Sequence, residues 1–335
     1  MRISTTMMMK RYGQVLNSKY EEINKYGNQI STTRAFEHAS EDPVAAMQTI
    51  KSCHEYTENQ QYQNSVSQTS SWINATETTV TEINDIVKTA TEKATEMTNG
   101  TNSSSDLQNF SVAIKSYRDE IVSTLNTTFG GQYIFGGNSK GPAPFKLDSS
   151  GNLQYYNYNA ATPSYVNVSS LTKSDVNAAN LSMPIDLGLG LTASGGSIDK
   201  GSAFEASTSG LDAIISDFNG TGGTAGNIVD NLTAVINNLS SGNTNGLKTI
   251  IGSLSNAQNS ILKVKVALGE KSNMLTEINT RLTDNESNIT DSLANSMEVD
   301  STEAIMNYNI SQLVYKESMS ISSTILQQSL IDFLK

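Results

Sequence analysis

The chain has 335 residues, and its 22 Lys and Arg against 33 Asp and Glu give a formal net charge of −11 at pH 7. Such a chain lacks the basic surface that displaces counterions from a phosphate backbone, which argues against nucleic-acid binding. Its longest apolar run, residues 44–47, has four residues, far below the ~20 that cross a bilayer, so we expect no membrane insertion and no cleaved secretion signal.

An amphipathic helix is predicted near the N-terminus, because apolar residues recur there at spacings of three and four. The seam is broken only by a lysine, and it consists of Met9, Tyr12, Leu16, Lys19, Ile23, Tyr26 and Ile30. Residues 31–41 are polar and irregular. We interpret this stretch as the connection to a second helix.

The second helix is expected to begin at Asp42 and Pro43. Asp42 supplies an N-cap carboxylate, and Pro43 takes the first helical position, where its missing N–H costs nothing. The apolar series then keeps its 3,4 spacing until Asn99 and Gly100, and its members are Val66, Thr69, Ile73, Thr76, Val80, Ile83, Val87, Ala90, Ala94 and Met97. This helix is therefore predicted to exceed about fifty residues.

A shorter third helix and a β-rich segment are predicted to follow. Ser105 and Gln108 match a capping box before an apolar stripe that ends at Leu125. Within residues 129–137, paired glycines on both sides of a β-prone run favour a β-hairpin. Residues 141–203 hold four of the five prolines and several alternating apolar and polar residues, so we interpret them as a small β-rich domain.

Helical periodicity returns after the β-rich segment. It is weak over residues 204–218 and 228–239 and strongest over residues 247–289. Strict 3,4 spacing there connects thirteen positions, of which eleven are apolar: Leu247, Ile250, Leu254, Ala257, Ile261, Val264, Leu268, Lys271, Leu275, Ile278, Leu282, Asn285 and Ile289. Such a run of heptads predicts a coiled-coil strand.

The last predicted helix begins at a capping box of Asp300 and Glu303 and continues almost to Lys335. At 100° per residue its apolar side chains fall on two opposite faces. One face carries Met306, Ile310, Leu313, Val314, Ile321 and Ile325. The other carries Ile305, Tyr308, Tyr315, Met319, Leu326, Leu330 and Phe333. The N-terminal helix can cover only one face, so we expect a neighbouring copy of the chain to cover the other.

These elements predict a mainly α fold with a β-rich insertion, in which the N- and C-terminal regions form a long coiled-coil helical bundle. We expect an inner assembly domain of terminal helices (residues 1–38 and 297–335), a helical bundle domain (39–140 and 204–296) and a small β-rich outer domain (141–203). The helical seams lie outside the outer domain. The bundle is therefore expected to fold without it.

The candidate site is an assembly interface. Its inner-helix residues are Met9, Tyr12, Leu16, Ile23, Ile30, Tyr308, Tyr315, Met319, Leu326, Leu330 and Phe333. Asp42 and Pro43 form its second part, a loop and helix cap where Pro43 fixes the backbone and removes a donor.

Groups that carry catalysis or hold metals are scarce. Cys53 is the single cysteine, and His38 and His54 are the two histidines; at these positions they do not make a metal site. The glycines of residues 187–191 are not followed by a P-loop lysine. No nucleophile, base and orienting group can be assembled, so we expect no enzyme activity, no catalytic residue, no cofactor and no metal.

The chain contains several recognisable short segments: Met1–Thr5, Gln29–Thr32, Glu41–Ala46, Asn126–Gly137 and Ser329–Leu334. Together they resemble the bacterial flagellin superfamily. The resemblance covers roughly residues 1–140 and 240–335. Flagellin filament subunits usually have a Lys-Asp-Asp-Ala-Ala-Gly type of segment where this chain has Glu41–Ala46. That difference favours a member that lies at the junction of hook and filament.

The resemblance implies a structural protein of the extracellular flagellum. It implies export in an unfolded state through the flagellar type III apparatus, with an export chaperone holding the C-terminal region. Copies of such a protein form a ring or short helical turn between the first hook-associated protein and flagellin. The implied role is an adaptor that joins hook to filament. With that role, the adaptor loop and helix cap at Asp42 and Pro43 are expected to distinguish the adaptor from a filament subunit.

Two alternatives remain open. A flagellin filament subunit would share the terminal helices and differ in its axial contacts. A signalling rod, such as a chemoreceptor cytoplasmic hairpin, also uses long heptads rich in Ala, Ser and Thr. The β-rich insertion and the two-faced last helix argue against the rod.

Overall fold

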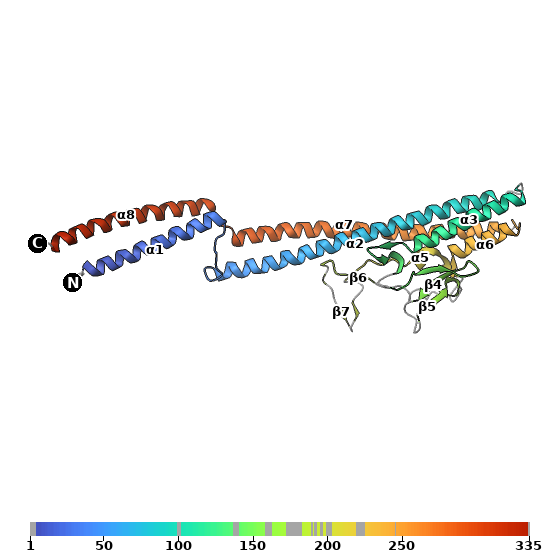
Figure 1. The fold of residues 1–335 in the computed structure, drawn as a ribbon, viewed down its shortest axis with the longest axis horizontal. Helices are drawn as coiled ribbons and strands as arrows, with labels where there is room; N and C mark the ends of the chain where they lie inside the picture. Colours follow the sequence, from blue (N-terminus) through green and yellow to red (C-terminus); the bar gives the residue numbers. More distant parts are fainter. Residues whose placement is uncertain are drawn as a thin grey trace. The chain divides into compact units, whose positions relative to one another are not determined.

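The computed structural model describes most of the chain. The described residues are 5–98, 102–136, 141–157, 163–171, 183–188, 190, 193–194, 197–198, 203–218, 225–244 and 246–333. Long helices come from both ends of the sequence, and short strands come from its middle (Figure 1). The predicted mainly α fold with a β-rich insertion is confirmed.

The helices agree closely with the apolar periodicity. Their bounds are α1 (Thr5–Thr32), α2 (Pro43–Glu96), α3 (Ser104–Leu125), α5 (Gly210–Ile214), α6 (Ile228–Ser240), α7 (Leu247–Met297) and α8 (Ser301–Phe333). The second helix has 54 residues and begins at Pro43, as predicted. Two short 3-10 helices span Ile134–Gly136 and Val168–Ser170.

The strands form small antiparallel sheets. A three-stranded sheet contains β3 (Phe145–Leu147), β4 (Leu153–Asn157) and β5 (Ser164–Asn167). The two-stranded pairs are β1 (Thr128–Phe129) with β2 (Gln132–Tyr133), β6 (Pro184–Ile185) with β9 (Phe204–Glu205), β7 (Ala193–Ser194) with β8 (Ser197–Ile198), and β10 (Ile215–Phe218) with β11 (Ala225–Asn227). A two-stranded hairpin is marginal alone; the β10–β11 pair, for example, is supported by contacts with α5 and α6.

The chain divides into two compact units. The first contains residues 1–60 and 283–335, and the second contains residues 61–282. Both α2 and α7 contribute to each unit. The predicted division into three domains, with boundaries after residues 38 and 296, describes layers of an assembled structure and stays a prediction.

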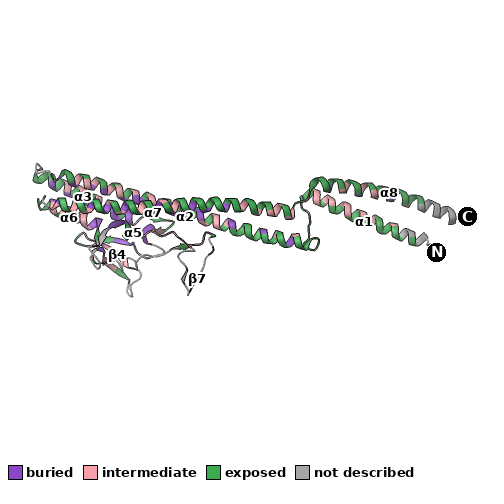
Figure 2. Ribbon diagram, turned by 180° about the vertical axis from the view of Figure 1, so that it is seen from behind, coloured by how far each residue is buried: buried purple, intermediate pink, exposed green. Residues whose placement is uncertain are grey.

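The core of the second unit follows the two predicted helical seams. All ten seam positions from Val66 to Met97 are buried, as are eight seam positions of α7 between Leu247 and Leu282. Figure 2 shows this burial along α2, α3, α6 and α7. The one lysine of the α7 seam, Lys271, is half-buried, and its Nζ donates to the Ser207 carbonyl at 2.9 Å. Burial lowers the pKa of this ammonium, and the Coulomb attraction of Glu205 opposes that shift.

The β-rich segment shares this core, which argues against a helical bundle that folds without residues 141–203; that expectation stays a prediction for a deletion experiment. The side chains of Phe145, Leu153 and Tyr155 are at most 3% exposed and belong to the same buried cluster as the helices. The Asn126 carboxamide, at the end of α3, donates to the Phe145 carbonyl at 2.8 Å and accepts from the Phe145 N–H at 3.0 Å. These bonds hold β3 against α3.

Three local predictions need correction. The capping box of α3 is formed by Ser103 and Asp106 rather than Ser105 and Gln108, because the helix begins two residues earlier than its apolar stripe indicates. The predicted hairpin exists, but Gly130 and Gly131 form its turn rather than flank its strands. Both have positive φ, 59° and 81°, which suits the two-residue turn of a tight hairpin.

The third correction concerns residues 204–218, for which weak helix was predicted. They form β9, the five-residue helix α5 and β10. The Ser209 side chain caps α5 by accepting from the Leu211 N–H at 3.2 Å. Parts of the predicted β-rich domain, including residues 158–162 and 172–182, lie outside the described residues.

Candidate assembly interface

Helices α1 and α8 lie side by side and antiparallel, with the two chain termini at the same end of the pair (Figure 1). Tyr20 and Tyr315 face each other with ring centroids 6.4 Å apart. Nearer the end of α1 and the start of α8, Gly27 packs against Tyr308, so that a Cβ at Gly27 would lie 3.7 Å from the Tyr308 ring. These contacts set the register of the two helices.

The α8 side of this seam is made of small residues and tyrosines. Ala304, Ser311 and Ser318 are buried, and Tyr308 and Tyr315 between them are half-buried. The spacing of these five positions is 4,3,4,3, which is a heptad seam. Small side chains at the contact let the two helix axes approach closely.

A polar bridge crosses the same seam. The Lys19 ammonium lies 2.7 Å from Glu22 Oε2, and the Ser311 hydroxyl donates to the same oxygen at 3.2 Å. The Lys19 hydrogen bond, which is the largest cause, and the Ser311 bond lower the pKa of Glu22. Lys19 interrupts the apolar seam of α1 because it serves this bridge.

Backbone hydrogen bonds fix the end of the helix pair at which α1 stops and α8 starts. The Ala35 N–H donates to the Met297 carbonyl at 2.8 Å, and the Val299 N–H donates to the Thr33 carbonyl at 3.1 Å. Thr33 has a φ of 59°, in the left-handed region that ends many helices. The chain therefore leaves α1 and enters α8 through two segments that pair with each other.

The predicted inner-helix residues are placed as follows. Tyr12, Leu16, Ile23 and Ile30 of α1 are half-buried, as are Tyr308 and Tyr315 of α8, whereas Met319 is exposed. The side chains of Met9, Leu326, Leu330 and Phe333 lie outside the described part. The structure thus brings the predicted Tyr308 and Tyr315 into the contact between α1 and α8 within one chain.

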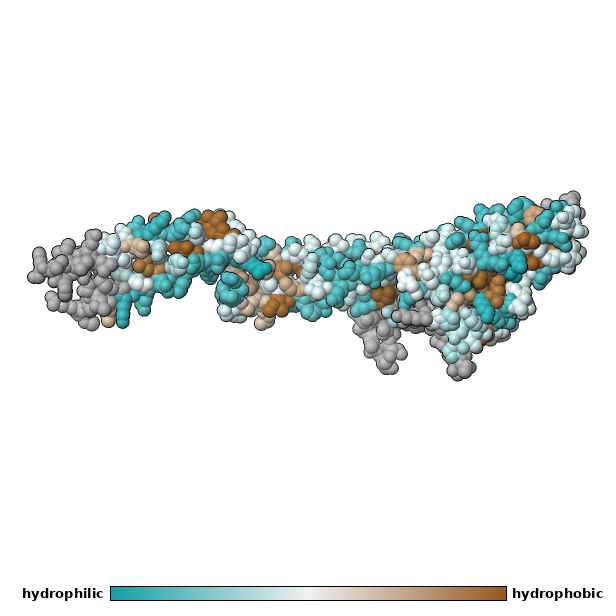
Figure 3. Space-filling view, in the orientation of Figure 1, coloured by the Kyte–Doolittle hydropathy of each residue, from teal (hydrophilic) through white to brown (hydrophobic). Residues whose placement is uncertain are grey.

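The opposite face of α8 has no cover within the described residues. Met306, Ile310, Leu313 and Ile321 form one stripe along the helix, and their side chains are 46–60% exposed. Apolar side chains at the surface of α8 are visible in Figure 3. We call these four residues the α8 stripe. The apolar periodicity identified both faces of α8 but not which of them pairs with α1. The small residues of the other face, Ala304, Ser311 and Ser318, were the signal that could have shown it.

Asp42 and Pro43 form the predicted helix cap. Asp42 Oδ1 accepts from the Val44 N–H at 3.1 Å and from the Ala45 N–H at 3.0 Å, and Pro43 opens α2. The first turns of α2 expose Val44, Met47 and Ile50. The role of this segment as an adaptor loop stays a prediction.

A groove of about 790 Å³ lies beside this cap in the first unit. Its apolar lining includes Phe36 and Val44, and its carboxylates include Asp42, Asp291 and Glu298. The cap is therefore bordered by a concave surface that combines apolar and acidic groups.

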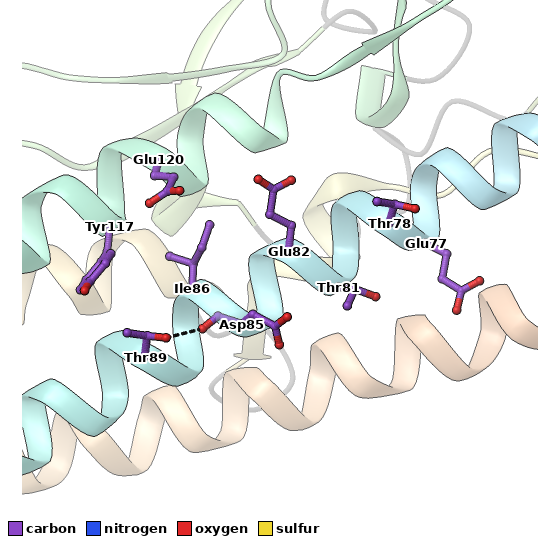
Figure 4. Close-up of a pocket in the computed structure, with 9 residues that line it drawn as sticks. All are labelled: Glu77, Thr78, Thr81, Glu82, Asp85, Ile86, Thr89, Tyr117 and Glu120. Carbon is purple, nitrogen blue, oxygen red and sulfur yellow. Dashed lines mark hydrogen bonds between the residues drawn. The ribbon is translucent and has the colours of Figure 1, made fainter.

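A second groove, of about 610 Å³, lies between α2 and α3 and is strongly acidic (Figure 4). Its carboxylates are Glu77, Glu82, Asp85 and Glu120.

Among the residues that the structure describes, no group of His, Cys, Asp and Glu side chains is arranged to hold a metal ion, and Cys53 is exposed. None of the described helices has an apolar stretch long enough to cross a bilayer.

Comparison with known sequences identifies relatives of this fold. Residues 3–140 match the family of the bacterial flagellin N-terminal helical region. Flagellar hook-associated protein 3 of Escherichia coli K12 is 32% identical over 146 residues, which are 43% of this chain and 46% of the relative. The protein of the same name from Salmonella typhimurium is 30% identical over 152 residues, 45% of this chain and 48% of the relative. The chain thus matches about half the length of these relatives.

Solved structures share the fold at low sequence identity. A chain described as a flagellar hook-associated protein from Vibrio parahaemolyticus has a TM-score of 0.60 and 16% identity, covering 77% of this chain and 100% of that one. The FlgL protein of Bacillus cereus has a TM-score of 0.52 and 17% identity, covering 73% and 99%. Residues 3–140 are thus similar to the N-terminal helical region of bacterial flagellin, and the two curated relatives are flagellar hook-associated proteins, which confirms the resemblance.

Proposed function

We propose that this protein is the adaptor that joins the flagellar hook to the flagellin filament. Its copies would assemble into a ring or short helical turn, with the first hook-associated protein on one side and flagellin on the other. The observation that carries this proposal is the α8 stripe, which pairing with α1 leaves exposed. The names of the relatives supply the flagellar setting.

The stripe supports self-assembly on energetic grounds. Fully burying one large apolar side chain is worth about 1.5–3 kcal/mol. Four such side chains in line, each about half exposed, therefore offer a neighbouring copy several kcal/mol. A contact between two different faces of identical subunits builds a ring when it closes and an open helix when it does not.

The remaining parts of the proposal concern export and partners. The protein would pass unfolded through the flagellar type III apparatus, with a chaperone holding its C-terminal region. It would work outside the cell as a structural part and not as an enzyme. A flagellin filament subunit is the alternative, because it would share α1 and α8.

Deletion of the gene tests the adaptor role. The deletion strain should keep its hooks, lack filaments and release flagellin monomers into the medium, since nothing would hold flagellin on the hook. Purified protein added from outside should restore filaments. A strain that lacks filaments and releases no flagellin would support the filament-subunit alternative. Filaments of normal length, with no second copy of the gene present, would refute the adaptor role.

A further inference from the structure

The first unit carries opposite charges at its two ends. Residues 1–19 contain four basic side chains and no acidic one. Beyond the other end of α1, residues 34–60 and 283–303 together contain eleven Asp and Glu against two Lys and Arg. The N-terminus lies at the end of α1 away from the loop that leads to α2 (Figure 1). Such a polarity favours contact between the basic end of one copy and the acidic end of another.

Four exposed side chains form one face near the start of α1. They fall within about 100° of one another around the helix axis, and they are Met7, Lys10, Arg11 and Gln14. We call them the basic face of α1. The half-buried Tyr12 points to the opposite side of the helix. Lys10 and Arg11 form no ion pair with any residue that the structure describes.

The acidic end of the first unit contains the groove of about 790 Å³ beside the α2 cap. Four carboxylates line this groove against a single ammonium, that of Lys25. All four are exposed and lack an ion pair within the described part of the chain; they are Glu41, Asp42, Asp291 and Glu298. Carboxylates that share one groove repel one another. A basic partner would therefore lower the electrostatic free energy of the groove.

We propose that the basic face of α1 binds in this groove of a neighbouring copy. The contact rests on the proposed self-assembly and gives it a register. The aliphatic stems of Lys10 and Arg11 would pack on Phe36 and Val44, which line the same groove, while their charged ends reach the carboxylates. An Arg guanidinium can bind one carboxylate through two parallel hydrogen bonds.

A second copy, rather than the same chain, must supply the basic face. Arg11 and Thr32 are separated by 21 residues of one continuous helix, which is about 32 Å at 1.5 Å per residue. No side chain reaches that far. Two different surfaces of identical chains therefore meet, and such a contact builds a ring when it closes and a helix when it does not. Since exposed ion pairs are individually weak, this contact sets the register while the α8 stripe supplies apolar burial.

Zero-length cross-linking of the full-length protein tests the contact directly. A carbodiimide joins an ammonium to a carboxylate that lies in direct contact with it. Equal amounts of ¹⁴N- and ¹⁵N-labelled protein would be mixed, allowed to assemble, cross-linked and analysed by peptide mass spectrometry. We expect Lys10 to be joined to Glu41, Asp291 or Glu298 in pairs of mixed isotope, which only two different copies can produce.

Charge reversal gives an independent test, measured by sedimentation. An α1 variant with Lys10→Glu and Arg11→Glu should assemble about tenfold more weakly than the unaltered protein, and so should a groove variant with Asp291→Lys and Glu298→Lys. An equimolar mixture of the two variants should assemble again, because each then offers the charge that the other needs. Circular dichroism would show that both variants are folded.

A control variant separates this contact from the effect of net charge. Lys115→Glu with Lys248→Glu changes the net charge as much as the α1 variant does, at two exposed positions of the second unit. It should assemble like the unaltered protein. If the control is weakened as much as the α1 variant, general repulsion explains the loss and the contact is refuted.

Three further results would overturn the proposal. They are the absence of mixed-isotope cross-links from Lys10 to the groove, normal assembly of the α1 variant, and a mixture of folded variants that stays unassembled. The adaptor role is judged separately by the deletion strain. A strain without filaments, combined with an α1 variant that assembles normally, would refute only this contact. Filaments that persist in the deletion strain would refute the adaptor role, whatever the cross-links show.

Discussion

At the scale of single residues, a few buried polar groups hold the β-rich segment against the helices. Arg118 of α3 donates from Nη1 to Thr233 Oγ1 at 3.3 Å, and the same hydroxyl donates to the Gly151 carbonyl at 2.7 Å. Asp230 of α6 accepts from the Leu153 N–H at 2.8 Å. These bonds fix the β3–β4 turn on α3 and α6, so substitutions there should affect the stability of the whole second unit.

Gly151→Ala should destabilise the protein by about 1–3 kcal/mol, the usual cost of a strained backbone position. Gly151 has a φ of 84°, and a Cβ there would collide with the Arg118 guanidinium. Gly242→Ala is the matched control, because Gly242 has a φ of 69° but open space around it. Urea denaturation should show a clearly larger loss for Gly151→Ala. Equal losses would mean that the Arg118 contact is unimportant.

Asp230 should make stability fall as the pH rises. Burial raises the pKa of its carboxyl above the ordinary 3.8, although the Leu153 and Asn227 hydrogen bonds oppose this. The folded state therefore holds a proton that the unfolded state releases, so this contribution is fully present below pH 3.8 and is lost as the pH passes the raised folded pKa. Urea denaturation across this range should show that Asp230→Asn removes the loss.

Asp148→Asn is the control of opposite sign for Asp230. Hydrogen bonds from Asn152 and from the Ser150 and Gly151 backbone lower the pKa of the Asp148 carboxyl. Its contribution to stability is therefore present above the unfolded pKa and lost as the pH falls. If both variants change the pH profile in the same direction, the assignment for Asp230 is wrong.

At the scale of secondary-structure elements, the assembly proposal depends on how α8 divides its two faces. The face with Ala304, Ser311 and Ser318 meets α1, and the face with the larger aliphatic side chains is left exposed. Small residues allow close helix contact, whereas long aliphatic ones offer more area to a separate partner. The face with the larger aliphatic side chains is therefore the one available to another copy.

Replacing Ile310 and Leu313 by Ser should block assembly and leave the monomer folded. Both side chains are more than half exposed in the single chain, so their loss should change the melting temperature of the monomer little. Sedimentation and electron microscopy would measure polymerisation, and circular dichroism would measure folding. Val112→Ser, at an exposed position of α3, is the control. Normal assembly of the double variant would refute the role of the α8 stripe.

At the scale of the whole molecule, the second unit is one compact body that joins parts distant in the sequence. Its buried cluster combines α2 and α7 with the three-stranded sheet. Phe145 of β3 and Leu153 of β4 belong to this cluster, and both are at most 1% exposed. The insertion is thus part of the core and not an appendage.

Removing residues 141–203 and joining the ends by a short Gly-Ser linker should abolish cooperative melting of the second unit. The single variant Phe145→Ala should already cost about 3–5 kcal/mol, as large aromatic truncations in cores do. Calorimetry and circular dichroism would follow both proteins. A deletion protein that melts cooperatively and still supports filament assembly would restore the independent outer domain expected from the sequence.

The sequence alone determined the long helices, because a 3,4 apolar spacing is a local property of the chain. It placed the start of α2 at Asp42 and Pro43 and found every buried seam position between Val66 and Met97. It also identified the two apolar faces of α8, whereas the inner-helix assembly residues stay a prediction. These features depend on residues within a few turns of each other.

Only the tertiary structure decided which surfaces meet. Periodicity marks a face as apolar but does not name its partner, so it could not show that Tyr308 and Tyr315 turn toward α1 while Ile310 and Leu313 stay exposed. The bonds that join the β-rich segment to α3 and α6 connect residues as many as 115 positions apart. Such pairings depend on the folded arrangement of the whole second unit, because no local pattern in the sequence records them.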